Sequence, residues 1–138
     1  MKKNEPRGIR NNNPLNIRIG NKWYGEVQCP TDNQFEQFTR MEYGVRAGYL
    51  LIKRYIEKYH LNTIKLIVSR WAPTSENNTN AYIASVEKLS GIPADKELRF
   101  RDYTEMITLV DAMIVVECGQ HIDIDTIRRG YELAKLTK

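Results

Sequence analysis

The stretch MITLVDAMIVVECG, residues 106–119, decides the fold of this chain. Its first eleven residues are apolar on nearly every side of a helix, and a helix of that kind is usually buried at the centre of a domain. We therefore expect a central helix over 103–117 that Gly119 ends, because glycine favours the left-handed conformation after a helix. The last turn of this helix carries one carboxyl group, that of Glu117.

Four more segments show the apolar spacing of helices. Val45, Tyr49, Ile52 and Ile56 form one stripe, which predicts a helix from about Gly44 to Tyr59. Further helices are expected at 63–70 after an Asn62 N-cap, at 77–91, and from Asp123 or Asp125 to Leu136.

The N-terminal third has a different pattern. Residues 1–16 are polar and rich in Asn, Arg, Pro and Gly, which predicts an irregular segment. Residues 17–38 alternate between apolar and polar types and carry turn signals, which predicts a short strand at 17–19 and a return strand at 22–24. Residues 34–38 are either a third short strand or part of the loop that leaves the sheet. The expected fold class is α+β and mostly helical: about five helices over 43–138 beside a small antiparallel sheet, in a single domain of residues 1–138.

The charge balance is mildly basic. The 138 residues carry a net charge of +4 and have a pI of about 9.1. Such a bias suits a polyanionic partner, such as nucleic acid, teichoic acid or the peptide stems of a cell wall, and it equally serves to keep a small protein in solution.

The cysteines and the N-terminus indicate a cytoplasmic origin. Cys29 and Cys118 are far apart in sequence and form no metal-binding pair, so free thiols are expected. The basic first residues precede no apolar run, which argues against a signal peptide, and no apolar stretch is long enough to span a membrane. Action in a virion or at the cell envelope would therefore require delivery by another factor.

The run RGIRNNNPLNIR at 7–18 is the first candidate for a site. It holds four Asn and three Arg, whose amide and guanidinium donors suit sugars, carboxylates or phosphates. Ile9, Leu15 and Ile17 interrupt the polar run and are expected to anchor it. The alternative is a solvated tail whose Asn side chains only satisfy turns.

Two other places could carry chemistry. Trp71 and Tyr82 flank a polar segment in which Asn77 or Thr79 can cap the following helix. Glu117 follows apolar residues, so desolvation is expected to raise its pKa and keep it protonated, as a general acid requires; the alternative is a Glu that reaches solvent. No cofactor and no metal site are expected, because the two histidines are isolated and no phosphate loop or nucleophile motif occurs.

The order of several motifs resembles one family. RGIRNNNPLNIR at 7–18, Trp23, Gly25, Phe35, Phe38, GVRA at 44–47, RWAP at 70–73 and ENNTNAYI at 76–83 resemble phage-associated, lysozyme-like proteins that are often labelled virion structural proteins. Residues 12–18 are also similar to the glycan-cleft segment of glucosaminidase-type domains. Residues 76–86 are similar to a lytic transglycosylase segment whose active-site tyrosine corresponds to Tyr82.

The position of the acid departs from those enzymes. Their catalytic Glu ends a buried helix that precedes the Asn-rich segment, whereas here only Glu5, in a Pro-flanked coil, precedes it. Residues 112–119, AMIVVECG, resemble that helix end instead. The resemblance then implies a circularly permuted lysozyme-like fold in which Glu117 faces Tyr82 and the Asn-rich segment across a cleft.

The resemblance implies an enzyme that cleaves peptidoglycan glycan strands, as a muramidase or a lytic transglycosylase. In that reading Glu117 is the general acid and Tyr82 positions it or a sugar hydroxyl. Contacts to the glycan would come from Arg10, Asn12, Asn13, Asn16, Trp23, Trp71 and Glu76, with Glu42 or Glu76 as the candidate second carboxylate.

Two other function classes compete with this one. The first is a non-catalytic lysozyme-like protein that binds cell wall or other virion proteins. The second is a basic nucleic-acid-binding protein, which would need its Lys and Arg gathered on one face. That class ranks last, because the basic residues, for example Lys53, Lys58 and Arg128, are scattered over several expected helices.

Overall fold

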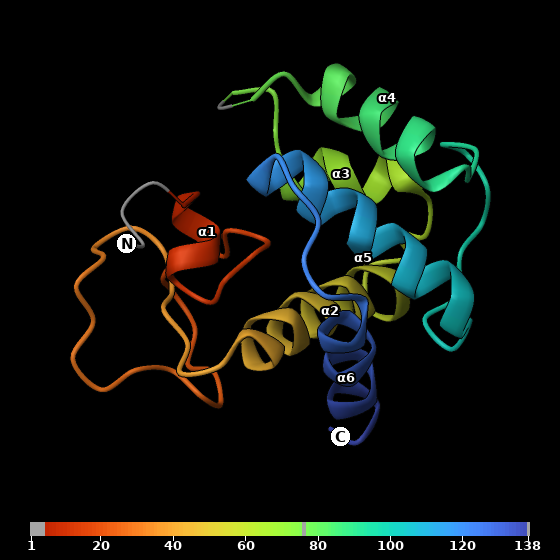
Figure 1. The fold of residues 1–138 in the computed structure, drawn as a ribbon. Coiled ribbons are helices and arrows are strands. Elements are labelled where there is room, and N and C mark those ends of the chain that lie inside the picture. The colour runs from red at the N-terminus through yellow and green to blue at the C-terminus, as the bar shows by residue number, and fades with distance from the viewer. Residues whose placement is uncertain (1–4, 76, 138) are drawn as a thin grey trace.

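Helices dominate the computed structural model, which describes residues 5–75 and 77–137 (Figure 1). The expectation of a mostly helical chain is confirmed. In chain order the helices of the described residues are α1 (Arg7–Arg10), α2 (Met41–Glu57), α3 (Ile64–Trp71), α4 (Thr79–Ser90), α5 (Tyr103–Cys118) and α6 (Ile124–Lys135). Helices α2 to α6 correspond to the five expected ones, and the single turn α1 lies in a segment that was expected to be irregular.

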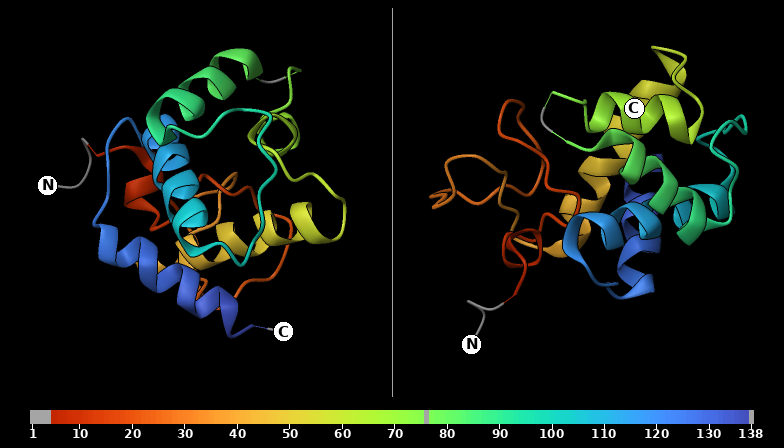
Figure 2. Two further views of the ribbon diagram at one scale, coloured as in Figure 1. Left: turned by 90° about the vertical axis from the view of Figure 1, so that its right-hand side faces the viewer. Right: turned by 90° about the horizontal axis from the view of Figure 1, so that it is seen from above.

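Helix α5 is the buried centre of the helical part. Met106, Leu109 and Met113 on it are fully buried, and the helix packs against both α4 and α6 (Figure 2). Asp102 caps its first turn by accepting a hydrogen bond from the backbone N–H of Glu105. At the other end Gly119 has a φ of 71°, the left-handed conformation that the sequence predicts for it.

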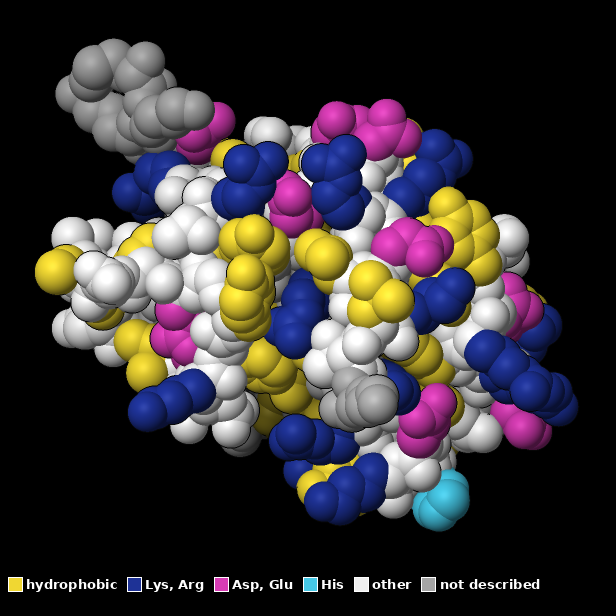
Figure 3. Space-filling model, turned by 90° about the horizontal axis from the view of Figure 1, so that it is seen from below, with side chains coloured by type: hydrophobic (Ala, Val, Ile, Leu, Met, Phe, Trp, Pro, Cys, Tyr) yellow, Lys and Arg dark blue, Asp and Glu magenta, His cyan; other side chains and the backbone are white. Residues whose placement is uncertain are grey.

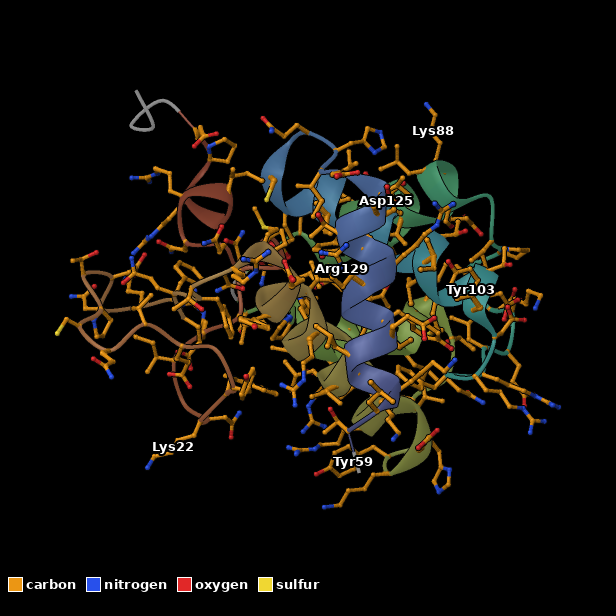
Figure 4. The ribbon with its side chains drawn as sticks, turned by 60° about the horizontal axis from the view of Figure 1, so that its bottom comes forward. Lys22, Tyr59, Lys88, Tyr103, Asp125 and Arg129 are labelled. Atoms are coloured by element: carbon orange, nitrogen blue, oxygen red, sulfur yellow. The ribbon has the colours of Figure 1, made fainter. Side chains whose placement is uncertain are left out.

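Helices α2 and α6 cross in close contact below α5 (Figure 4). A Cβ on Gly130 of α6 would lie 2.4 Å from Cγ1 of Val45, so the missing side chain permits this approach. Tyr49 of α2 and Tyr131 of α6 meet edge to face, with ring centroids 5.3 Å apart. Aromatic pairs of this geometry stabilise a core beyond the area that they bury.

The expected small sheet is replaced by an irregular segment. In the described part of the chain, residues 17–38 contain two isolated antiparallel bridges, Arg18 with Phe35 and Glu26 with Phe38, and no regular strand. The expected return strand 22–24 makes no bridge in the described residues, and Arg18 pairs with Phe35 instead.

Side chains form hydrogen bonds with backbone N–H groups that would pair with a neighbouring strand in a regular sheet. Asp32 Oδ1 accepts hydrogen bonds from the backbone N–H groups of Gln34 and Phe35. Gln37 Oε1 accepts from the backbone N–H groups of Thr31 and Asp32. Polar side chains that bind nearby backbone in this way compete with a ladder, which is why the alternating pattern does not extend into strands.

Apolar anchors fix the N-terminal region on one side of α2 (Figures 1 and 2). Leu15 is fully buried in the main core and lies over Gly48, where a Cβ would be 2.2 Å from its Cδ1. Ile17 packs in a second cluster with Phe38 and Ala47. The expectation that Leu15 and Ile17 anchor the polar run is confirmed, whereas Ile9 is half-buried and belongs to neither core cluster.

Basic side chains do not gather on the face shown in Figure 3, where Lys and Arg lie among acidic and neutral residues. The two thiols are free, Cys29 exposed and Cys118 buried. In the ranges that the structure describes, the helices are too short or too polar to cross a bilayer.

Candidate functional site

Glu117 lies where three distant parts of the chain meet. Its Oε1 accepts a hydrogen bond from Nδ2 of Asn16 at 2.9 Å, and its Oε2 accepts one from the hydroxyl of Tyr82 at 2.9 Å. Asn16 follows α1, Tyr82 belongs to the first turn of α4, and Glu117 ends α5. Side chains 101 and 35 residues away thus hold the two oxygens of one carboxyl group.

Local backbone geometry aims Asn16 at the carboxyl. Asn16 has a φ of 52°, a left-handed conformation that Asn tolerates better than most residues. Next to it, Leu15 is buried in the core and the backbone oxygen of Pro14 accepts a hydrogen bond from Cys118 Sγ at 3.2 Å. The N-terminal segment is therefore fixed to the end of α5 beside the site.

The start of α4 aims Tyr82. Asn78 caps this helix by accepting a hydrogen bond from the backbone N–H of Ala81 at 3.1 Å. Thr79 is buried and its hydroxyl donates to the backbone oxygen of Ala72, just after α3. These contacts tie the first turn of α4 to the end of α3, so Tyr82 enters the core with its hydroxyl at Glu117.

Burial decides the protonation of both groups. Desolvation raises the pKa of Glu117, and the hydrogen bonds from Asn16 and Tyr82, together with the nearby Trp71, offset part of that rise. Burial, together with the neighbouring Glu117 charge, raises the pKa of the Tyr82 hydroxyl well above its ordinary value. Glu117 thus retains a proton at higher pH than an exposed Glu does, and Tyr82 remains a neutral donor.

A cleft of about 380 Å³ opens over this carboxyl group. Besides Glu117 and Asn16, its walls include Arg18, Phe35, Tyr55, Arg70, Trp71 and Asn77. The volume is in the range of pockets for small ligands, and the walls combine apolar rings with a few polar groups, as such pockets usually do.

Trp71 forms an aromatic wall of the cleft at the end of α3. It is partly buried and meets Tyr55 of α2 edge to face, with ring centroids 6.1 Å apart. Two rings in contact restrict each other's rotamers, so the wall is preformed. Of the residues named from the sequence, Glu117, Tyr82, Asn16 and Trp71 are brought together here.

Two predicted glycan-binding amides serve the fold instead. Asn13 is fully buried, and its Nδ2 donates to the backbone oxygens of Ile17 and Glu36 while its Oδ1 accepts from the backbone N–H of Ile17. Asn12 Nδ2 donates to the backbone oxygen of Phe38 at 3.0 Å. Their amide donors are used inside the protein, because the turn that they form must satisfy its own backbone.

Three other named residues do not line the described cleft. Arg10 is exposed beside a separate polar hollow, and Trp23 lines another one with Lys53 and Arg54. Glu42 lies at the start of α2, where it pairs with Arg40 and Arg129, the latter marked on α6 in Figure 4. Glu76 lies outside the described residues.

Sequence reasoning missed the roles of Arg18, Arg70 and Tyr55 as cleft walls. Arg70 adjoins Trp71 and Arg18 ends the Asn-rich run, so closeness to a named residue was the available signal. Tyr55 lies on the apolar stripe of α2, where helical periodicity indicates core and gives no sign of a cleft. Across 5–75 and 77–137, no three His, Cys, Asp or Glu side chains cluster as metal ligands would.

The comparison with known proteins gives a phage relative. No protein-family model matches the chain. The chain is 40% identical over 131 residues to Protein P5 of Pseudoalteromonas phage PM2, and the match covers 91% of this chain and 80% of the phage protein. Similarity of this degree over most of both chains shows common descent, and the chain therefore belongs to the family of this phage protein.

Proposed function

We propose that this protein cleaves the glycan strands of peptidoglycan, with Glu117 as the general acid. The observation that carries the proposal is a single carboxyl at a cleft, partly buried, with its two oxygens held by Asn16 and Tyr82. A desolvated carboxyl next to an open cleft can donate a proton at a pH where exposed carboxyls are ionised. The phage origin of the relative agrees with an enzyme that acts on bacterial cell wall.

The arrangement also agrees with a permuted lysozyme-like fold. The Asn-rich segment near the N-terminus and the Glu-bearing end of α5 are far apart in sequence and in contact in space. In the enzymes that these motifs resemble, the acid-bearing helix comes first. A permutation keeps the packing of two segments and changes only their order, which folded domains tolerate.

The proposed step begins with protonation. Glu117 donates its proton to the glycosidic oxygen as the bond from that oxygen to the sugar C1 breaks, and the leaving sugar departs with a hydroxyl group. Among the described walls of the cleft, Glu117 is the carboxyl group. In the proposed step a group of the substrate itself, such as the 6-hydroxyl, attacks the C1 centre, and its proton returns to Glu117.

The walls of the cleft suit an amino sugar. Trp71 offers an apolar ring face on which a sugar can stack, and Asn77 offers amide groups to hydroxyl or N-acetyl groups. Tyr82 donates to the carboxyl in the resting site and stabilises the negative charge that appears when Glu117 loses its proton.

A second candidate is a virion or wall-binding protein without catalysis. One observation favours it: Asn16 Nδ2 also lies 3.5 Å from the backbone oxygen of Glu117, so the same contacts tie the N-terminal segment to α5. A carboxyl used in this way would serve the fold alone. The two candidates differ in whether Glu117 is needed for turnover.

Loss of turbidity of purified cell walls tests the proposal. Glu117→Gln keeps the shape of the side chain and removes its acid, so the rate of lysis should fall by about 100-fold or more. In the wild type, lysis should decline as the pH rises above the pKa of Glu117, because only the protonated form donates.

Glu57→Gln is the matched control, since Glu57 is exposed on α2 away from the cleft. Melting curves should show that both variants fold. Undiminished lysis by folded Glu117→Gln would remove Glu117 from the mechanism. Wall binding by the wild type without any lysis would establish the second candidate.

A further inference from the structure

Two arginines line the same cleft as its acid. Arg18 comes from the irregular segment and Arg70 from the last turn of α3, and both line the hollow that Glu117 lines. Their positions put two permanent positive charges at a cleft whose carboxyl has a pKa raised by burial.

Each guanidinium is stacked on aromatic rings. The Cζ of Arg18 lies 4.9 Å from the ring centroid of Phe35. The Cζ of Arg70 lies 5.2 Å from the ring of Tyr59, which follows α2 (Figure 4), and 5.7 Å from that of Tyr55. Stacking uses the face of a guanidinium and leaves the N–H groups at its edge available to a ligand.

Neither guanidinium is neutralised by the described part of the protein. Within residues 5–75 and 77–137, Arg18 and Arg70 make no ion pair and donate no side-chain hydrogen bond, whereas Arg7 is paired with Asp32 and Arg129 with Glu42. An arginine with an oriented plane and free edge donors is suited to bind a carboxylate through two parallel hydrogen bonds.

We propose that Arg18 and Arg70 select glycan strands that carry carboxylate groups over neutral glycans. The proposal rests on the proposed function, because it assigns a specificity to the same cleft. In peptidoglycan such carboxylates occur on the peptide stems and, where a stem has been removed, on the lactyl substituent of the muramic acid. A chitin-like strand of N-acetylglucosamine has neither, so it would leave both arginines without a partner.

Binding measured without turnover tests this selectivity. All proteins carry Glu117→Gln, and titration calorimetry compares three probes: chitohexaose, soluble glycan strands with intact stems, and strands whose stems an amidase has removed to leave lactyl carboxylates. The protein should bind both carboxylated probes more tightly than chitohexaose. The two strands tell whether stem or lactyl carboxylates supply the contact.

The double substitution Arg18→Gln/Arg70→Gln should weaken binding of a carboxylated probe by about ten-fold or more, as expected for charged hydrogen bonds, and leave chitohexaose binding unchanged. Arg99→Gln/Arg101→Gln removes the same charge from exposed positions that line a different hollow, and should bind all three probes as before. Arg18→Lys/Arg70→Lys keeps the charge without the paired donors and should give an intermediate loss.

Several outcomes overturn the inference. They are equal loss of affinity for all three probes, equal loss in both double substitutions, or an arginine-dependent affinity for a single-stranded oligonucleotide that exceeds the affinity for the strands. Failure of the proposed function has a different signature, since an enzyme that lyses no wall could still show arginine-dependent selectivity here. Lysis with unselective binding would refute the selectivity alone.

Discussion

At the scale of single residues, Glu117 and Glu36 are two carboxyl groups that burial affects in different ways. Glu117 opens onto a cleft and is held by two donors. Glu36 is 5% exposed, and its Oε2 is buried without a hydrogen-bond partner. The pKa of Glu36 is raised to about 7. Burial is the larger cause, because it disfavours the charged form, and the nearby carboxyl of Glu26 adds to the rise, because it disfavours a second negative charge.

Glu36 should therefore make the stability of the fold depend on pH. Its pKa is higher in the folded than in the unfolded chain, so the folded state binds the proton more tightly and stability falls as the pH rises from about 4.5 to about 7. Glu36→Gln should remove roughly 2 kcal/mol of this fall, as measured by urea unfolding between pH 5 and pH 8.

Glu57→Gln, which removes an exposed carboxyl of α2, is the control and should retain the fall that Glu36→Gln removes. A wild-type stability that stays level between pH 5 and pH 8, or a Glu36→Gln protein that loses as much stability as the wild type, would contradict this reading.

A property of a site residue could be predicted from the sequence where it depends on residues that are near in the chain. The pKa of Glu117 could be anticipated from the apolar residues that precede it in the central helix. The role of Asn13 could not, because an amide that serves a ligand and one that serves a turn look alike in a sequence. Its assignment depends on which backbone groups lie beside it, and these come from residues 17 and 36.

At the scale of elements, the close packing of the Asn-rich turn against α2 depends on Gly44. A Cβ at Gly44, in the first turn of α2, would lie 2.0 Å from the backbone oxygen of Asn12 and 3.1 Å from the Cα of Asn13. These are backbone atoms of a turn in which Asn12 itself has a φ of 54°, so they cannot move aside cheaply.

Gly44→Ala should therefore lower the free energy of unfolding by about 1–3 kcal/mol, the usual cost of an overpacked contact, even though Ala favours helix. Gly20→Ala is the control, because a Cβ there would meet nothing within 4 Å. Chemical denaturation measures both. A Gly44→Ala protein as stable as the wild type would show that the turn shifts without cost.

The helices were predictable and the sheet was not, for one physical reason. The apolar stripe of α2 and the uniformly apolar α5 define buried faces over many residues, and tertiary packing then enforces the period. Residues 17–38 have only short alternations, and neighbouring polar side chains such as Asp32 bind the backbone first. Between residues 17 and 38 the described structure therefore contains two isolated β-bridges in place of strands.

At the scale of the whole molecule, the protection of backbone amides from hydrogen exchange should differ between helix α5 and the N-terminal segment. Helix α5 is buried among the other helices, while much of the backbone between residues 19 and 34 belongs to exposed residues outside helices. In hydrogen–deuterium exchange, amides of 106–114 should be the slowest and those of 19–34 among the fastest, because local opening precedes global unfolding. Equal rates in both regions would refute this ordering.

The meeting of Asn16, Tyr82 and Glu117 belongs to this largest scale. Apolar periodicity says nothing about which end of one helix touches a turn 101 residues earlier. The resemblance to lysozyme-like proteins suggested that these three residues meet, because it compares the order of whole motifs rather than the apolar periodicity of one helix. Arg18 lies in the run RGIRNNNPLNIR and Arg70 in RWAP, but neither motif indicates that the two arginines line one cleft.

The hydrogen bond between Asn16 and Glu117 has a consequence for the order of events during translation. Asn16 is synthesised early, whereas its partner Glu117 is added 101 residues later. The contact between the two side chains therefore cannot form until the end of α5 has been translated. Prematurely terminated products that stop before the end of α5 would lack that carboxyl altogether. A lytic activity that depends on Glu117 is then confined to chains that have been translated beyond the end of α5.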